Sequence, residues 1–219
     1  MNTMVRELVH VPSGQVQLEG MLVVPADARG VVLFAHGSGS SRHSPRNNFV
    51  AMELQRASLA TLLIDLLTVE EDATYDIRFD ITLLSVRLGD VAHWLGRHDE
   101  TARLPLGLFG ASTGAAAALN LAAALPERVA AVVSRGGRPD LAESAALARV
   151  RAPTLLIVGG NDAEVIELNR TALNRLHCIR KMHIVPSAGH LFSEPGTLEE
   201  VARLGTDWFT SHLTPAAKL

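Results

Sequence analysis

The sequence predicts a doubly wound α/β domain whose sheet is mostly parallel, with an antiparallel edge at its N-terminal end. Three observations support this prediction. An alternating segment near the start indicates a hairpin, short apolar runs without polar alternation follow it, and segments of helical length separate those runs. Such runs are typical of strands that are buried on both faces and joined by helices.

The first expected element is a β-hairpin. Apolar and polar residues alternate through residues 8–11 and again through residues 16–23. The segment Pro12-Ser13-Gly14 between them has the composition of a tight turn. We therefore expect two antiparallel strands at the edge of the sheet.

Apolar runs and helical patterns then alternate along the chain. The apolar runs predict strands at residues 31–35, 60–64, 106–109, 129–133, 154–158 and 182–185. The intervening patterns predict helices at residues 48–57, 80–97, 114–125, 141–148, 164–175 and 198–213. Residues 66–78 show neither pattern, and we expect their acidic run Glu70-Glu71-Asp72 to lie in a solvated loop. No segment is long enough to form a large lid.

Composition favours a single globular domain over residues 1–219, with a hydrophobic content of 47% and 20% charged residues. The formal net charge of −3 gives no argument for a nucleic-acid or membrane partner. We see no signal peptide and no apolar run that could span a bilayer. The lone cysteine, Cys178, excludes an internal disulfide and favours a cytoplasmic location. The pattern gives no oligomeric state.

The motif Gly110-x-Ser112-x-Gly114 lies directly between the expected strand 106–109 and an alanine-rich helix. A turn this tight strains its central residue, and glycines at both flanks let strand and helix approach closely. The serine hydroxyl is then exposed above the sheet, at the N-terminus of the helix. We predict that Ser112 is a catalytic nucleophile; the alternative is an ordinary tight turn.

A serine hydroxyl needs a base, and the base needs an orienting group. Asp162 follows the expected strand 154–158, and His190 follows the expected strand 182–185. The order Ser112, Asp162, His190 is the order of a catalytic triad on this type of sheet. We predict that His190 is the base and that Asp162 orients it.

Each of these assignments has an alternative. Asp162 could serve only as the N-cap of the following helix, and His190 could be a loop histidine bonded to backbone. Asp140 is the main rival acid, although it is well placed to cap the helix expected after it. A reactive role for Cys178 is disfavoured, because a lone helical cysteine is usually a packing residue.

Backbone amides must stabilise the negative charge that forms on the substrate oxygen. The strand 31–35 ends in His36-Gly37-Ser38-Gly39, which predicts an oxyanion hole made by the amides of Ser38 and Thr113. We interpret His36 as a structural residue. The glycine pair lacks the third glycine of a dinucleotide motif and the lysine of a P-loop, so nucleotide binding is disfavoured.

Four arginines follow strands at the catalytic edge: Arg42, Arg46, Arg135 and Arg138. They are candidates for binding a carboxylate or phosphate of an anionic substrate. In the alternative interpretation, which we favour, they pair with local acids such as Asp65, Asp140 or Glu194. The remaining histidines have no ligand-like spacing, so we expect no metal site.

Together these motifs resemble the α/β-hydrolases; they are His36-Gly37-Ser38-Gly39, Gly110-x-Ser112-x-Gly114, Gly160-Asn161-Asp162 and Ala188-Gly189-His190. The small size and the loop that ends at Arg42 are similar to proteins grouped with dienelactone hydrolase. The resemblance implies an eight-stranded sheet and hydrolysis of an ester or lactone without a cofactor. Dienelactone hydrolases proper have cysteine at the nucleophile position, so Ser112 favours ordinary ester chemistry.

The function that we expect is that of a serine hydrolase acting on small carboxylic esters, thioesters or lactones. The same triad could also support acyl transfer or perhydrolysis. A third alternative is a binding protein that retains the fold without catalysis, because a fold alone does not establish a function.

Overall fold

Eight strands form one sheet in the order β1-β2-β4-β3-β5-β6-β7-β8 in the computed structural model, which describes residues 4–213. The strands are β1 (Val5–Ser13), β2 (Val16–Val24), β3 (Val31–Ala35), β4 (Ala60–Ile64), β5 (Leu106–Ala111), β6 (Val129–Arg135), β7 (Thr154–Gly159) and β8 (Arg180–Val185). The pairs β1–β2 and β2–β4 are antiparallel, and all other pairs are parallel. The expected mostly parallel sheet with an N-terminal hairpin is confirmed.

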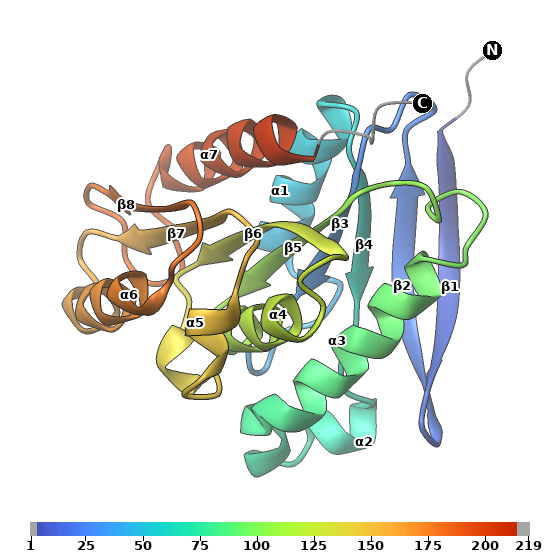
Figure 1. Ribbon diagram of the computed structural model, residues 1–219, viewed down its shortest axis with the longest axis horizontal. Helices are drawn as coiled ribbons and strands as arrows, with labels where there is room; N and C mark the ends of the chain where they lie inside the picture. Colours follow the sequence, from blue (N-terminus) through green and yellow to red (C-terminus); the bar gives the residue numbers. More distant parts are fainter. Residues whose placement is uncertain (1–3, 214–219) are drawn as a thin grey trace.

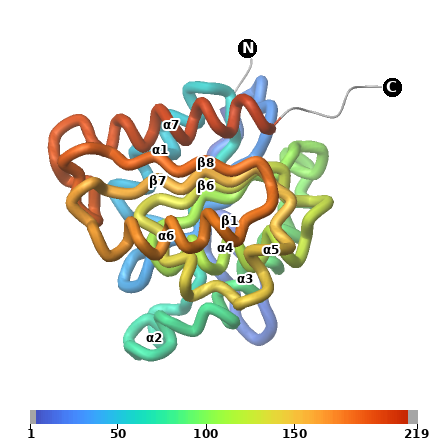
Figure 2. The backbone as a smooth tube through the Cα atoms, turned by 60° about the vertical axis from the view of Figure 1, so that its left-hand side comes forward, coloured from blue at the N-terminus to red at the C-terminus, as the bar shows by residue number. Residues whose placement is uncertain are grey.

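Helices cover both faces of the sheet (Figure 1). Helices α1 (Pro45–Arg56) and α7 (Thr197–His212) lie on one face, and α3 (Ile81–Leu95), α4 (Thr113–Ala124) and α6 (Ala163–Arg175) lie on the other. Figure 2 shows the sheet between these two layers. The shorter elements are α2 (Val69–Asp72), α5 (Ala146–Arg149) and the 3₁₀ turns η1 (Asp76–Phe79) and η2 (Pro139–Leu141).

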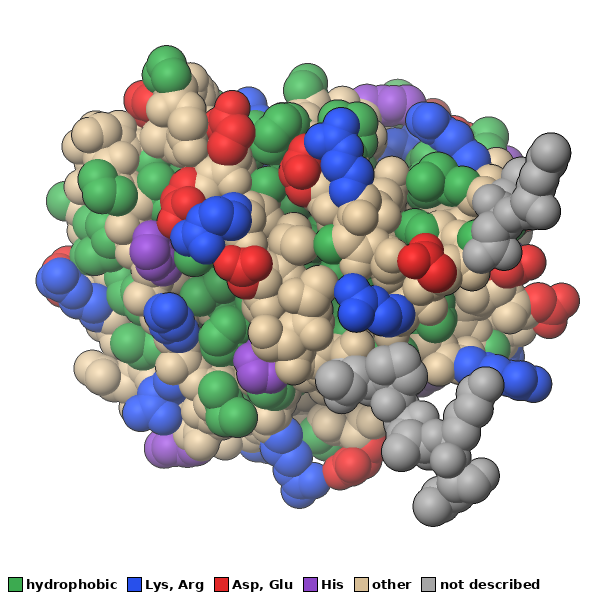
Figure 3. Space-filling model, turned by 90° about the horizontal axis from the view of Figure 1, so that it is seen from above, with side chains coloured by type: hydrophobic (Ala, Val, Ile, Leu, Met, Phe, Trp, Pro, Cys, Tyr) green, Lys and Arg blue, Asp and Glu red, His purple; other side chains and the backbone are tan. Residues whose placement is uncertain are grey.

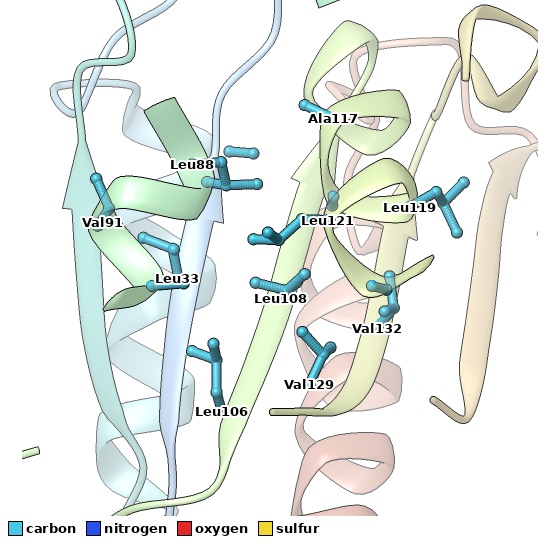
Figure 4. Packing of buried hydrophobic residues seen from close by; sticks show 14 of the residues in the cluster. Leu33, Leu88, Val91, Leu106, Leu108, Ala117, Leu119, Leu121, Val129 and Val132 are labelled. Carbon is cyan, nitrogen blue, oxygen red and sulfur yellow. The ribbon is translucent and has the colours of Figure 1, made fainter. Parts of the chain in front are cut away.

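The apolar runs of β3, β4, β5 and β7 are continuous because these strands are buried on both faces, whereas the edge strand β8 is mostly exposed or half-buried. Neighbouring residues of a strand point to opposite sides, so Leu33 packs toward α3 and α4 while Phe34 packs toward α1 and α7. Leu108 and Phe109 divide in the same way, and Figure 4 shows Leu108 beside Leu33 in the first core. In the second core the rings of Phe34 and Phe109 lie 4.8 Å apart. Two buried layers thus fix the strand ends that carry the site.

The prediction of one continuous helix at residues 141–148 is wrong. The chain forms the 3₁₀ turn η2 and then the single-turn helix α5. The Glu143 amide donates to the Asn120 side chain at 2.9 Å, and the Ala142 amide bonds to Pro139 in a 3₁₀ pattern. A contact with a distant part of the chain therefore replaces the hydrogen bonds that a continuous helix would need.

The outer face over α1 and α7 carries positive and negative side chains intermixed, without a patch of one sign (Figure 3). Within residues 4–213, no helix is long and apolar enough to cross a membrane.

Candidate active site

The carboxyl ends of five adjacent parallel strands, β3, β5, β6, β7 and β8, meet at one edge of the sheet. The loops that follow four of them carry the predicted site residues Ser38, Ser112, Asp162 and His190. The topology therefore gathers residues that are far apart in the sequence. Ligands of open α/β sheets bind at this edge.

Ser112 lies between β5 and α4 with φ 51° and ψ −121°. A positive φ is strained for any residue except glycine, and such strain is concentrated at functional sites. A Cβ atom on Gly110 would lie 2.4 Å from the Cα of Ala115, and one on Gly114 would lie 2.2 Å from the carbonyl oxygen of Ala35. Both glycines are thus required by direct packing of the helix start against the strands.

Asp162 and His190 form a hydrogen bond, with the Asp162 Oδ2 atom 2.7 Å from His190 Nδ1. Asp162 precedes α6, but its side chain makes no capping hydrogen bond. The rival Asp140 accepts from Arg138 at 2.9 and 2.8 Å instead. The structure thus brings Asp162, not Asp140, to the predicted base. With Nδ1–H as the donor, Nε2 is free to accept a proton.

The nucleophile and the base lie beside the same short segment after β6. The Ser112 amide donates to the carbonyl of Arg135 at 3.2 Å. A Cβ atom on Gly136 would lie 3.6 Å from Cε1 of His190. No hydrogen bond joins the side chains of Ser112 and His190 among the residues that the structure describes. Such catalytic hydrogen bonds often tighten only when substrate binds.

The two predicted oxyanion donors are neighbours. The Ser38 amide donates to Thr113 Oγ1 at 2.9 Å, and a Cβ atom on Gly37 would lie 3.0 Å from the Cβ of Ser112. Thr113 is the first residue of α4, where amides have no partner within the helix. The contact between Ser38 and the Thr113 hydroxyl was not predicted from the sequence. The hydroxyl residue directly after the nucleophile is the feature of the sequence that could have indicated it.

His36 anchors the loop that follows β3. Its Nδ1 donates to the carbonyl of Gly37 at 3.0 Å, and its Nε2 accepts from the Leu66 amide at 3.0 Å. Burial lowers the pKa of His36, which favours the neutral ring that this pattern needs. The geometry agrees with the structural role that we expected for His36.

Arg87 joins the same network from helix α3. It donates to the carbonyl of Leu66 at 2.8 Å and to both carboxylate oxygens of Glu71, at 2.5 and 2.7 Å. The hydrogen bonds from Arg87 lower the pKa of Glu71 to about 2. The expectation of a solvated acidic loop is therefore wrong for Glu71, which lies in helix α2 and pairs with Arg87, 16 residues later in the chain; no local pattern indicates that contact.

The four candidate arginines divide into two kinds. Arg42 pairs with Glu19 and Asp65, and Arg138 pairs with Asp140, so the alternative interpretation holds for these two. Arg46 and Arg135 form no ion pair within residues 4–213. Their charges are thus not neutralised by the described part of the chain.

Cys178 is partly buried, and burial raises the pKa of its thiol, which disfavours the reactive thiolate. In the described part of the chain, no group of three His, Cys, Asp or Glu side chains could hold a metal ion.

Known proteins resemble nearly the whole of this chain. A crystal structure of dienelactone hydrolase from Anabaena variabilis is 55% identical, with a TM-score of 0.93 over 96% of this chain and 99% of that one. Est1E from Butyrivibrio proteoclasticus is 13% identical with a TM-score of 0.80, over 93% of this chain and 98% of that one, and shares the fold. No family model matches the chain.

Two Mycobacterium tuberculosis proteins are 56% identical over 207 residues and carry the provisional name phosphoribosyl transferase. The match covers 94% of this chain but 46% of theirs, so the chain spans about half the length of these curated relatives. The likeness to the Anabaena protein, by contrast, extends over nearly all of both chains. The chain therefore belongs to the dienelactone hydrolase family of α/β-hydrolases.

Proposed function

We propose that this protein is a serine hydrolase that cleaves small carboxylic esters, thioesters or lactones, with Ser112 as nucleophile, His190 as base and Asp162 as orienting acid. The observation that carries the proposal is the 2.7 Å hydrogen bond between Asp162 and His190 beside the strained Ser112. Membership of a family of hydrolases supports the same reaction class.

The reaction begins when the Ser112 hydroxyl attacks the acyl carbonyl and His190 Nε2 takes its proton. Asp162 accepts from Nδ1–H, so it holds the correct tautomer and stabilises the imidazolium that forms. The amides of Ser38 and Thr113 stabilise the oxyanion, for which the Ser38 amide must turn from the Thr113 hydroxyl toward the substrate oxygen. His190 then protonates the leaving alcohol, or the ring oxygen of a lactone.

Water completes the cycle. His190 removes a proton from a water molecule, which attacks the acyl-serine ester; the acyl–oxygen bond then breaks, His190 returns the proton to Ser112 Oγ, and the acid product leaves. An alcohol, amine or peroxide in place of water would give acyl transfer or perhydrolysis. We place hydrolysis first because the side chain of His190 is 40% exposed, which gives water direct access.

Two other functions have less support. A binding protein without catalysis would not need a strained serine next to a paired histidine and carboxylate. Phosphoribosyl transfer appears only in the name of two longer relatives. That name applies to the full-length proteins, and this chain matches 46% of their length. The cytoplasmic location stays a prediction.

The proposal is tested by replacing Ser112. We expect Ser112→Ala to fold normally and to lower kcat on 4-nitrophenyl acetate by about three to six orders of magnitude. Ser193→Ala is the matched control, because this exposed serine lies three residues after the base and should retain activity. Turnover by Ser112→Ala at the wild-type rate would contradict the assignment. Loss of activity in both variants would show a general effect on the fold.

A further inference from the structure

Arg135 carries a buried positive charge without a counter-charge. Its side chain lies at the end of β6 and the residue is 7% exposed. Within residues 4–213 it forms no ion pair; its nearest partner is the neutral side-chain oxygen of Asn47, at 3.4 Å, and its Nε atom has no partner. A buried charge is costly unless it is paired, so this arrangement requires an explanation.

The surroundings of Arg135 add positive charge. Arg46 is close enough to lower the pKa of Arg135, together with the larger effect of burial, to about 10, which leaves the guanidinium protonated at neutral pH. The Nε atom of Arg46 is also buried and has no hydrogen-bond partner in the described part of the chain. Arg46 and Asn47 lie in the first turn of the twelve-residue helix α1, and this first turn contains no acidic residue. The N-terminus of a helix is itself electropositive.

This cationic cluster, formed by Arg46 and Arg135, borders the candidate active site. The Arg135 carbonyl accepts from the Ser112 amide. The Arg135 guanidinium lies 5.9 Å from the centre of the Phe192 ring, and Phe192 follows His190 by two residues. A group bound to the cluster would therefore lie close to an ester positioned on the serine.

The other two candidate arginines at this edge have carboxylate partners that neutralise their charge. Arg42 has two carboxylate partners, and Arg138 has two hydrogen bonds to Asp140. Within residues 4–213 the cationic cluster has no carboxylate partner of this kind. The absence of a carboxylate partner thus distinguishes Arg46 and Arg135 from the other two arginines at this edge.

We propose that Arg46 and Arg135 bind a phosphomonoester group of the substrate. The proposal rests on the proposed function, because it assigns the substrate class of the same site. A phosphate dianion matches two guanidinium groups in charge and offers several acceptor oxygens for their planar donors. A carboxylate carries one charge and would neutralise half of the cluster. The preferred substrate is then a phosphorylated ester or lactone.

Binding is tested without turnover. Inorganic phosphate is titrated into Ser112→Ala by calorimetry at constant ionic strength, with chloride as the reference anion. We expect Arg135→Gln, added to this background, to weaken phosphate binding at least about tenfold, and Arg135→Lys, which keeps the charge, to weaken it less. Arg138→Gln, whose arginine already has an acid partner, is the matched control and should bind as the parent does. Circular dichroism checks that each variant is folded. If Arg135→Gln does not fold, the same titration is carried out with Arg46→Gln.

Turnover distinguishes the anions. Three 4-nitrophenyl esters of one short acyl chain, ending in a methyl, a carboxylate or a phosphonate group, are compared by kcat/KM. We expect the phosphonate ester to be preferred by at least about tenfold and the preference to disappear in Arg135→Gln. A preference for the carboxylate or the methyl ester would overturn the proposal, as would equal phosphate binding by Arg135→Gln and its parent. If no ester is cleaved, the proposed function fails, and the phosphate titration still decides the present inference.

Discussion

Two loops face the serine, and they are held in different ways. The loop after β3, residues 36–44, is fixed by both ring nitrogens of His36, by the bond from Ser38 to Thr113 and by the ion pairs of Arg42. The loop after β8, residues 186–196, presents a half-exposed His190 that Asp162 holds through one nitrogen. That loop is itself held by bonds of Asn161 to Ala188 and Ser187 and by the bond of the Gly189 amide to Glu194. The difference lies in the His190 ring, which has one bonded nitrogen and stays half-exposed.

This difference follows from what each loop does in the proposed reaction. Amides that stabilise a transient charge are most effective when little reorganisation is needed, and in a firmly held loop the Ser38 amide has only to exchange the Thr113 hydroxyl for the substrate oxygen. His190 takes a proton from the serine and then gives it to the leaving group. Anchoring through Nδ1 alone leaves Nε2 free for both transfers. The predictions below weaken each loop in turn.

The largest effect is expected from removing the anchor of the base. Asp162→Asn should lower kcat by about four orders of magnitude while the fold remains intact, because the neutral amide no longer selects the required tautomer. Asp140→Asn is the control and should leave kcat within about threefold, since Asp140 is bonded to Arg138. A larger loss in Asp140→Asn than in Asp162→Asn would reverse the assignment of the acid.

The loop after β3 is tested through Thr113. Thr113→Val keeps the shape of the side chain but leaves the Ser38 amide without its partner, so the donor is less well positioned. We expect kcat to fall by about tenfold to a hundredfold with little change in KM, which is less than complete loss of a donor. Thr113→Ser restores the hydroxyl and should restore most of the rate. A faster Thr113→Val enzyme would mean that the hydroxyl competes with the substrate for the amide.

The smallest effect concerns stability and its dependence on pH. The pKa of Glu71 is lowered from 4.5 to about 2 by Arg87, so its contribution is present above pH 4.5 and is lost as the pH falls toward 2. Glu71→Gln should therefore lower the free energy of unfolding at pH 7 by about 1 kcal/mol, the scale of one charged hydrogen bond in a partly exposed site. The difference from wild type, measured by urea unfolding, should shrink below pH 4. A difference that is the same at both pH values would contradict the ion pair.

Much of the fold could be predicted, because the pattern that specifies it is local. The strands at 31–35 and 60–64 begin and end where the apolar runs do, and the glycines around Ser112 mark the tight turn. Features that depend on distant partners were missed. Asn120 interrupts the helix expected at 141–148, and Arg87 neutralises Glu71. The single domain over residues 1–219 stays a prediction.

In the candidate site, too, local features could be predicted and contacts between distant residues could not. The type of each catalytic residue and its place after a strand were readable, since both follow from chain order. The sequence could not separate Arg135 from Arg138, because both follow the expected strand 129–133 and only their neighbours in space differ. Nor could it show that the Ser38 amide already has a partner.

The most direct test of the central claim is to label the protein with a fluorophosphonate and identify the modified residue by peptide mass spectrometry. We predict one stoichiometric adduct on Ser112, formed much more slowly in His190→Ala, in which the base is missing. An unlabelled protein, or a label on another serine while Ser112 stays free, would contradict the account.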